Sequence, residues 1–174
     1  MIVLAKKYAA LLTRSGDQPR ALSDGMRTCF EVLSLAAAID RDCAARLGAH
    51  DLSEGKFVLL FLLEEAEDGL SPHELAEQAG VTRGTVTGLL DGLERSGFVR
   101  RGSNDIDRRK LTVRLTADGA ALTQHLKAEH GRWIGSLFSD LSADECDTLR
   151  QLLAKVFART ATAAGTGKVV TDGK

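Results

Sequence analysis

The sequence predicts a mainly α-helical fold in which a helix-turn-helix is followed by a charged, two-stranded β-hairpin. Residues 71–96 show the apolar spacing and the end signals of two short helices joined by a tight turn. Residues 107–116, with the sequence DRRKLTVRLT, form a basic ribbon in which apolar and polar side chains alternate. The composition, with 44% hydrophobic residues, 5% aromatic residues and two prolines, favours a helix-rich globular chain over a disordered one.

Bulk properties exclude several classes of protein. The 174 residues are enough for one domain with a core or for the subunit of a small dimer. No apolar run approaches the roughly 18 residues that span a membrane, and the apolar run at the start is too short for a signal peptide. Three cysteines without a CxxC spacing suit a reduced cytosol and give no metal signature. We expect a cytoplasmic protein that needs no cofactor or metal.

Charge is distributed unevenly along the chain. Residues 81–116 hold eight Lys/Arg and four Asp/Glu, which makes this window +4 and leaves −5 for the rest of a chain whose net charge is −1. The overall charge argues against indiscriminate coating of nucleic acid. The local basic face attracts phosphates at one place and repels them elsewhere.

The N-terminal part is predicted to form two helices. Residues 1–14 carry apolar side chains at helical spacing, within an extension that covers residues 1–22. A longer helix is predicted to begin after Ser23 as its N-cap and to stop at Gly48.

Residues 57–63 are seven apolar residues in a row. Periodicity alone cannot distinguish a buried strand from a buried helix in such a run. We favour a helix in the centre of the fold, because Ser53 can cap it and Glu54 suits its first turn.

End signals define the helix-turn-helix. A capping box of Ser71 and Glu74 begins the first helix, and Gly80 is predicted to end it in the left-handed conformation. Thr82 is predicted to cap the second helix, which Gly97 stops.

Two strands and two helices are predicted to follow. The strands are expected at residues 98–101 and 110–115 around a turn-rich tip. Thr116 is expected to cap a helix over residues 117–138. A second capping box, at Ser142, begins a last helix that we expect to run to about Ala163.

The second helix of the pair has a flat face opposite its apolar stripe. Gly84 and Gly88 lie four residues apart on this face, although each glycine costs about 1 kcal/mol relative to alanine in a helix. Without side chains there, the backbone can approach a broad surface such as the floor of a major groove. The alternative is that both glycines are neutral surface positions. We predict that the face contacts DNA through Thr82, Arg83, Gly84, Thr85, Thr87 and Gly88.

The hairpin adds a second set of basic residues. Arg108 and Arg109 beside the tip are predicted to enter a minor groove, whose negative potential attracts arginine. Asp107 is predicted to brace Arg109 through a forked carboxylate–guanidinium pair. The alternative is a solvated charged loop. Contacts that position the protein on phosphates are predicted for Arg100, Arg101 and Lys110.

These residues carry a family resemblance. The motif Asp107-x-Arg109-x-x-x-Val113-x-Leu115-Thr116 resembles the wing signature of the MarR family of winged-helix transcriptional regulators. The segment from Leu75 to Arg101 resembles the helix-turn-helix of that family, and the order of elements is similar over roughly residues 25–160. The resemblance implies a mainly α fold: a winged helix-turn-helix with a two-stranded β-wing and an intertwined helical dimerisation region. It also implies a homodimer on a palindromic operator in double-stranded DNA, controlled by a small ligand, often phenolic or anionic, or by cysteine oxidation.

The resemblance also implies a division of the chain. The winged helix-turn-helix would occupy residues 51–116, and the dimerisation region residues 23–50 and 117–163. A tail of residues 164–174 is predicted to be mobile. The apolar faces outside the DNA-binding part are too many for one small lobe, which supports dimerisation independently. The side chains expected to bury between protomers are Leu122, Leu126, Trp133, Leu137, Phe138, Leu149, Leu152, Leu153, Val156 and Phe157.

Two groups of residues are candidates for the control of such a regulator. Asp40, Arg41, His50 and Trp133 are candidates for a ligand-binding cleft between the dimer base and the DNA lobe, although each also suits an ordinary surface or core position. Cys29 is placed like the reactive cysteine of peroxide-sensing relatives. The stretch Leu52–Leu63, where those sensors carry tyrosines, contains none, and a thiol without a stabilising partner reacts slowly.

Three other features of the sequence suggest different functions. Ser53-x-x-Lys56 matches an acylating-serine motif without its partner motifs, so we expect no enzyme. His125 and Glu129 can share a helix face, which allows at most weak metal binding. A winged helix used only for protein–protein contact is the remaining alternative. The preferred prediction is a ligand-relieved repressor.

Overall fold

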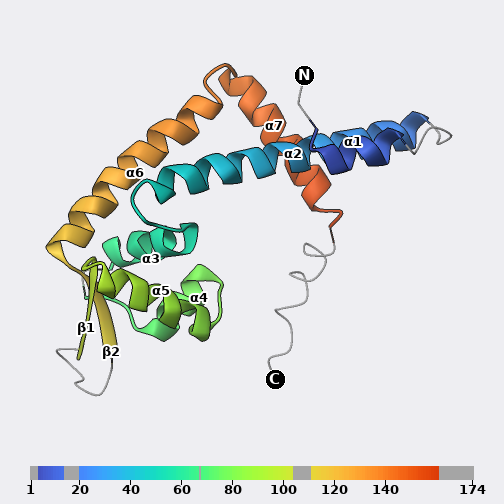
Figure 1. The fold of residues 1–174 in the computed structure, drawn as a ribbon. Coiled ribbons are helices and arrows are strands. Elements are labelled where there is room, and N and C mark those ends of the chain that lie inside the picture. The colour runs from blue at the N-terminus through green and yellow to red at the C-terminus, as the bar shows by residue number, and fades with distance from the viewer. Residues whose placement is uncertain (1–3, 14–19, 67, 104–110, 161–174) are drawn as a thin grey trace, which may run out of the picture. The chain divides into compact units, whose positions relative to one another are not determined.

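The computed structural model describes residues 4–13, 20–66, 68–103 and 111–160. The described residues fold into two compact units, divided between Thr123 and Gln124, and each unit is considered separately. The elements, labelled in Figure 1, are α1 (Lys6–Thr13), α2 (Arg20–Gly48), α3 (Glu54–Glu64), α4 (Pro72–Ala79), α5 (Arg83–Arg95), β1 (Val99–Ser103), β2 (Leu111–Leu115), α6 (Ala117–Leu137) and α7 (Ala143–Phe157). The predicted mainly α fold with a two-stranded wing is confirmed.

Helix α3 is central to the first unit. It contacts α2, α4, α5 and β2, and its side chains Leu59, Leu60 and Leu63 are buried. The Ser53 hydroxyl accepts the Lys56 N–H at 3.4 Å and caps the helix. The apolar run at residues 57–63 is therefore helical, as predicted, and the surrounding elements bury one side of it, while Phe61 stays exposed.

Helices α4 and α5 form the predicted helix-turn-helix. The Ser71 and Glu74 capping box is present, with the Glu74 carboxylate accepting the Ser71 N–H at 2.8 Å. Gly80 ends α4 with φ of 65°, a left-handed conformation that a side chain would strain. Thr82 caps α5. The buried stripe of α5 consists of Val86, Leu90 and Leu93.

The hairpin is tied to the chain segment before α4. Strands β1 and β2 are antiparallel, with Arg101 opposite Val113 and Arg100 opposite Arg114. Leu70 and Val113 exchange two backbone hydrogen bonds, of 3.0 and 2.8 Å, as an isolated antiparallel bridge. The Arg114 Nε–H also donates to the Asp68 carbonyl oxygen at 3.0 Å. The base of the wing is thus continuous with the core.

The start of α6 is fixed to the base of the wing. As predicted, the Thr116 hydroxyl caps α6 by accepting the Gly119 N–H at 3.0 Å. The same hydroxyl donates to the Gly97 carbonyl at 2.7 Å, and the Thr116 N–H donates to the Phe98 carbonyl at 3.0 Å. Gly119 packs so closely on this segment that a Cβ there would lie 1.9 Å from the Phe98 carbonyl oxygen.

The start of helix α2 differs from the prediction, whereas its end at Gly48 agrees with it. Helix α2 begins at Arg20 instead of after Ser23, because Arg, Ala and Leu at residues 20–22 are strong helix formers and extend the helix. Gly48 is its last residue and has no positive φ; that conformation occurs at Asp51, with φ of 57°. The prediction of Ser23 as N-cap was therefore wrong.

The last helix is shorter than predicted. Helix α7 begins at the predicted capping box of Ser142 and Glu145 but ends at Phe157, well before Ala163. The Thr160 hydroxyl donates to the Phe157 carbonyl at 2.8 Å, a local bond that competes with continuation of the helix. The predicted tail, residues 164–174, lies outside the described residues.

In the first unit, α1 packs on α2. The Tyr8 and Phe30 rings stack with centroids 4.8 Å apart, and the Ala5 N–H donates to the Ser34 hydroxyl at 3.3 Å. The predicted N-terminal helix is therefore present over a shorter range. Across the described segments, no helix is both long enough and apolar enough to cross a membrane.

Candidate nucleic-acid interface

Helix α5 presents the face that the sequence predicts. Thr82, Arg83, Gly84, Thr85, Thr87 and Gly88 are all exposed, while the stripe formed by Val86, Leu90 and Leu93 is buried. A Cβ added at Gly88 would meet no atom within 4 Å, and one at Gly84 would meet only the Thr82 hydroxyl at 3.8 Å. The two glycines therefore leave open space beside the helix and are not required by packing.

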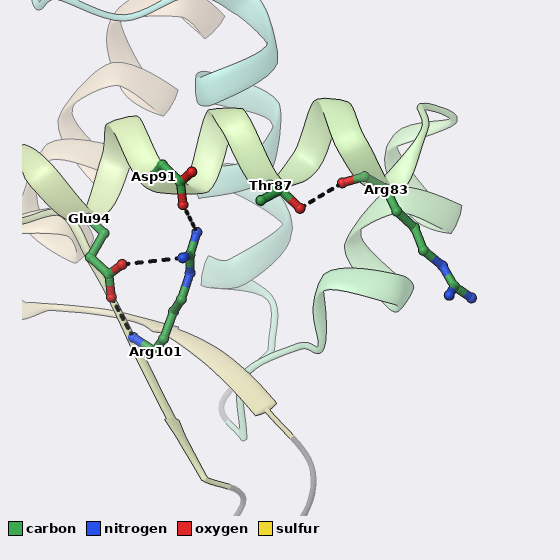
Figure 2. A network of polar contacts seen from close by, with 5 residues as sticks. All are labelled: Arg83, Thr87, Asp91, Glu94 and Arg101. Atoms are coloured by element: carbon green, nitrogen blue, oxygen red, sulfur yellow. Dashed lines mark hydrogen bonds and ion pairs between the residues drawn. The ribbon is translucent and has the colours of Figure 1, made fainter.

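The polar groups of this face are held by local bonds. The Thr82 hydroxyl accepts the Thr85 N–H at 3.2 Å, and the two threonine hydroxyls are 2.9 Å apart. The Thr87 hydroxyl donates to the Arg83 carbonyl at 2.9 Å. The Arg83 guanidinium extends away from the helix (Figure 2), where one nitrogen lies 3.2 Å from His73 Nδ1. Arg83 is thus a long exposed cation at the N-terminal end of α5.

The two adjacent arginines of β1 have different surroundings. The Arg100 side chain is exposed. The Arg101 side chain points toward α5 (Figure 2), and its guanidinium lies 2.5 Å from Asp91 Oδ1 and 3.5 Å from Glu94 Oε2. Residues 107–110, which include Asp107, Arg108, Arg109 and Lys110, lie outside the described residues, so their roles stay predictions.

Sequence reasoning missed Asp91 and Glu94 as partners of the hairpin. The sequence-based predictions give no role to either residue. A signal was present, because strand alternation places Arg101 on the same side of β1 as the buried Val99, and therefore toward the body of the domain.

The predicted ligand-binding residues belong to different units. Asp40 and Arg41 are exposed on α2 and His50 is half-buried, all within the first unit. Trp133 is buried in the second unit, with its ring centroid 4.9 Å from that of His130. The cleft that these residues were expected to line remains a prediction.

The cysteines and the His125 pair also have defined surroundings. Cys29 is exposed on α2. Burial, and then the negative charges of Glu54 and Asp40, raise the pKa of the Cys43 thiol above its ordinary value. His125 Nε2 lies 3.7 Å from Glu129 Oε2 on one face of α6, as the sequence predicts for this pair.

The chain is similar to known regulators. The sequence model of the MarR family matches residues 52–111. The chain is 43% identical over 109 residues to the transcriptional repressor YetL of Bacillus subtilis, a match that covers 62% of this chain and 65% of YetL, just under two thirds. It is 30% identical over 134 residues to the transcriptional regulator PapX of Escherichia coli, covering 76% of this chain and 80% of PapX.

Solved structures agree with the sequence relatives. A cysteine-to-serine mutant of MarR from Escherichia coli, complexed with operator DNA, superposes with a TM-score of 0.59 and 31% identity, covering 72% of this chain and 89% of that chain. The helix-turn-helix, its glycine-bearing face, the wing and the match to PapX lead to one assignment. The chain belongs to the MarR family of winged helix-turn-helix transcriptional regulators.

Proposed function

We propose that the protein is a sequence-specific DNA-binding regulator that acts as a homodimeric repressor on a palindromic operator. The observation that carries the proposal is the exposed face of α5, where Gly84 and Gly88 leave open space beside Arg83. Such a face lets the helix backbone lie close to the floor of a major groove. The relation to repressors and the operator complex of Escherichia coli MarR support the proposal.

In the proposed complex, α5 enters the major groove. Arg83 reaches guanine edges, which present two acceptors to a guanidinium, while Thr85 and Thr87 contact a thymine methyl group or a phosphate. Arg100 contacts phosphates and sets the position of the domain on the duplex. The wing-tip residues Arg108 and Arg109 are proposed to enter the adjacent minor groove.

Exposed apolar side chains support the homodimer. Leu152, Leu153, Val156 and Phe157 of α7 are all exposed, and Val156 is 67% exposed. A contiguous apolar face of this kind is typical of an interface. Light scattering should give twice the chain mass for the wild type and the single chain mass for Val156→Asp. A monomeric wild type would contradict the dimer, and with it the palindromic operator.

An effector is proposed to release the operator by changing the spacing of the two α5 helices, in proportion to its preference for the altered state. Trp133 is the only tryptophan of the chain, so its fluorescence tests the predicted ligand site directly. Phenolic carboxylates that lower operator affinity should also change this fluorescence, and Arg41→Ala should weaken both effects. For the Cys29 alternative, peroxide should release the operator from the wild type but not from Cys29→Ser.

The decisive experiment is a salt series of binding to DNA from upstream of the protein's own gene, with scrambled DNA as the reference. We expect tight binding to the first fragment only, with a steep loss of affinity as salt increases. Equal and weak binding to both fragments would contradict an operator at that locus and favour a winged helix that serves a protein partner.

Two variants test the mechanism. Arg83→Ala should lower operator affinity by about 1–3 kcal/mol if the guanidinium contacts a base edge. Arg150→Ala is the control, because it removes the same charge from α7, where Arg150 pairs with Asp147 one turn away. If Arg83→Ala and Arg150→Ala bind alike, the proposed reading by α5 is wrong.

A further inference from the structure

The two arginines of β1 lie on opposite faces of the hairpin. Arg101 shares its face with Val99, and its partner across the ladder is Val113; both valines are buried. Arg100 stands on the other face opposite Arg114 and is exposed. Alternation along the strand therefore places one cation toward solvent and its neighbour toward α5.

Arg101 is held by two carboxylates one turn apart on α5. Its Nη2 is 2.5 Å from Asp91 Oδ1, and its Nη1 is 3.5 Å from Glu94 Oε2. The second Glu94 oxygen accepts the backbone N–H of Arg101 at 3.3 Å. Glu94 thus contacts both the main chain and the side chain of one wing residue (Figure 2).

The surroundings of Arg101 limit its availability to DNA. Its side chain is 25% exposed, whereas those of Asp91 and Glu94 are 47% and 41% exposed. Its Nε is buried and finds no acceptor among the residues that the structure describes. The two Nη atoms of Arg101 contact carboxylates of α5, while its Nε–H has no acceptor among the described residues. The contacts with α5 therefore determine the position of the guanidinium.

We infer that Arg101 is a positioning residue that fixes the wing to α5, so that helix and wing meet DNA as one rigid unit. This inference rests on the proposed function and gives Arg101 a role different from the phosphate contact that the sequence suggested. The rigid, planar fork of the guanidinium meets both carboxylates in a fixed geometry, which the ammonium of lysine on its flexible stem does not reproduce.

The test compares Arg101→Gln, Arg101→Lys and Arg100→Gln in operator binding across a salt series. Arg101→Gln should lower affinity roughly tenfold, as expected for a coupled charge network, with the slope of log affinity against log salt unchanged. Arg101→Lys should not restore affinity. Arg100→Gln, the matched control, should reduce the slope by about 0.9, as expected when one phosphate contact is lost.

Asp91→Asn distinguishes two explanations, because they predict opposite changes in operator affinity. Removing a negative charge beside DNA should strengthen binding if charge alone matters. The positioning role predicts weaker binding, and it predicts that Asp91→Asn adds little to the loss already caused by Arg101→Gln.

Hydrogen exchange without DNA separates this inference from the proposed function. Amides of residues 99–103 and 111–115 should exchange faster in Arg101→Gln and at the wild-type rate in Arg100→Gln. If the wild type binds no operator, the proposed function fails, while exchange still decides whether Arg101 holds the hairpin. Unchanged exchange in Arg101→Gln, together with a reduced salt slope and rescue by lysine, would overturn the inference.

Discussion

Replacing Gly119 with alanine tests how closely the start of α6 is fixed to the wing. Alanine is favoured over glycine in a helix by about 1 kcal/mol, so helix propensity alone predicts a stabilised protein. A Cβ at this position would lie 1.9 Å from the Phe98 carbonyl oxygen and 2.8 Å from its carbonyl carbon. Both are backbone atoms that cannot rotate away, so residues 97–98 and the first turn of α6 must separate.

The expected magnitude follows from the contacts that this separation disturbs. Overpacking costs roughly 1–3 kcal/mol. The two bonds from Thr116 to the carbonyls of Phe98 and Gly97, of 3.0 and 2.7 Å, contribute about 1 kcal/mol each. After subtraction of about 1 kcal/mol for the better helix former, Gly119→Ala should lower the free energy of unfolding by about 2–4 kcal/mol.

The assay is urea unfolding followed by far-UV circular dichroism at one fixed protein concentration, because dimerisation would make stability depend on concentration. Gly131→Ala is the matched control in the same helix, since no atom lies within 4 Å of its added Cβ. That variant should gain up to about 1 kcal/mol. Equal stability of Gly119→Ala and Gly131→Ala would contradict the close packing of Gly119 against the Phe98 carbonyl.

Three further predictions concern other parts of the chain. Gly88→Ala should raise the melting temperature, because its Cβ meets nothing and alanine favours the helix by about 1 kcal/mol, yet it should weaken operator binding; unchanged affinity would argue against close approach of α5 to DNA. Hydrogen bonds from the Ser142 N–H and hydroxyl lower the pKa of Glu145 below its ordinary value of 4.5. This stabilisation is therefore present above that pH and lost as the pH falls through the lowered pKa, so the difference in melting temperature between wild type and Glu145→Gln should shrink on acidification. A difference independent of pH would refute it. Because burial raises the pKa of Cys43, iodoacetamide should modify it more slowly in the folded than in the urea-unfolded chain at one pH. Equal rates, measured by peptide mass spectrometry, would contradict the burial.

Features with local causes were predictable from the sequence. The capping boxes at Ser71 and Ser142 and the left-handed Gly80 each depend on a few neighbouring residues, and all three are present. The exposed glycines of α5 were also predictable, because helical spacing alone separates their face from the buried stripe. For the same reason, the residues of the predicted contact face of α5 are all exposed in the structure.

Features with distant causes were not predictable in the same way. The close approach of Gly119 to Phe98 brings together two segments that the whole hairpin separates in the sequence. No residue pattern in the sequence predicts this contact. At the end of α7, the backbone N–H and the hydroxyl of Thr160 both donate to the Phe157 carbonyl, and no helix-end signal in the sequence predicts this turn. Arg101 lies between these cases, because strand alternation indicates its direction but not the carboxylates that it meets.

The bridge between Leu70 and Val113 has a consequence for the order in which the domain folds. It joins the residues on either side of α4, α5 and β1, and so closes that stretch of chain into a loop whose ends are held by backbone bonds. Closing such a loop costs chain entropy before its contacts contribute, so it forms later than the local helices. During synthesis, a chain that ends before Val113 can form α4 and α5. It cannot yet form the bridge between Leu70 and Val113 that encloses these two helices. The DNA-binding half therefore reaches its final geometry only after the second wing strand has left the ribosome.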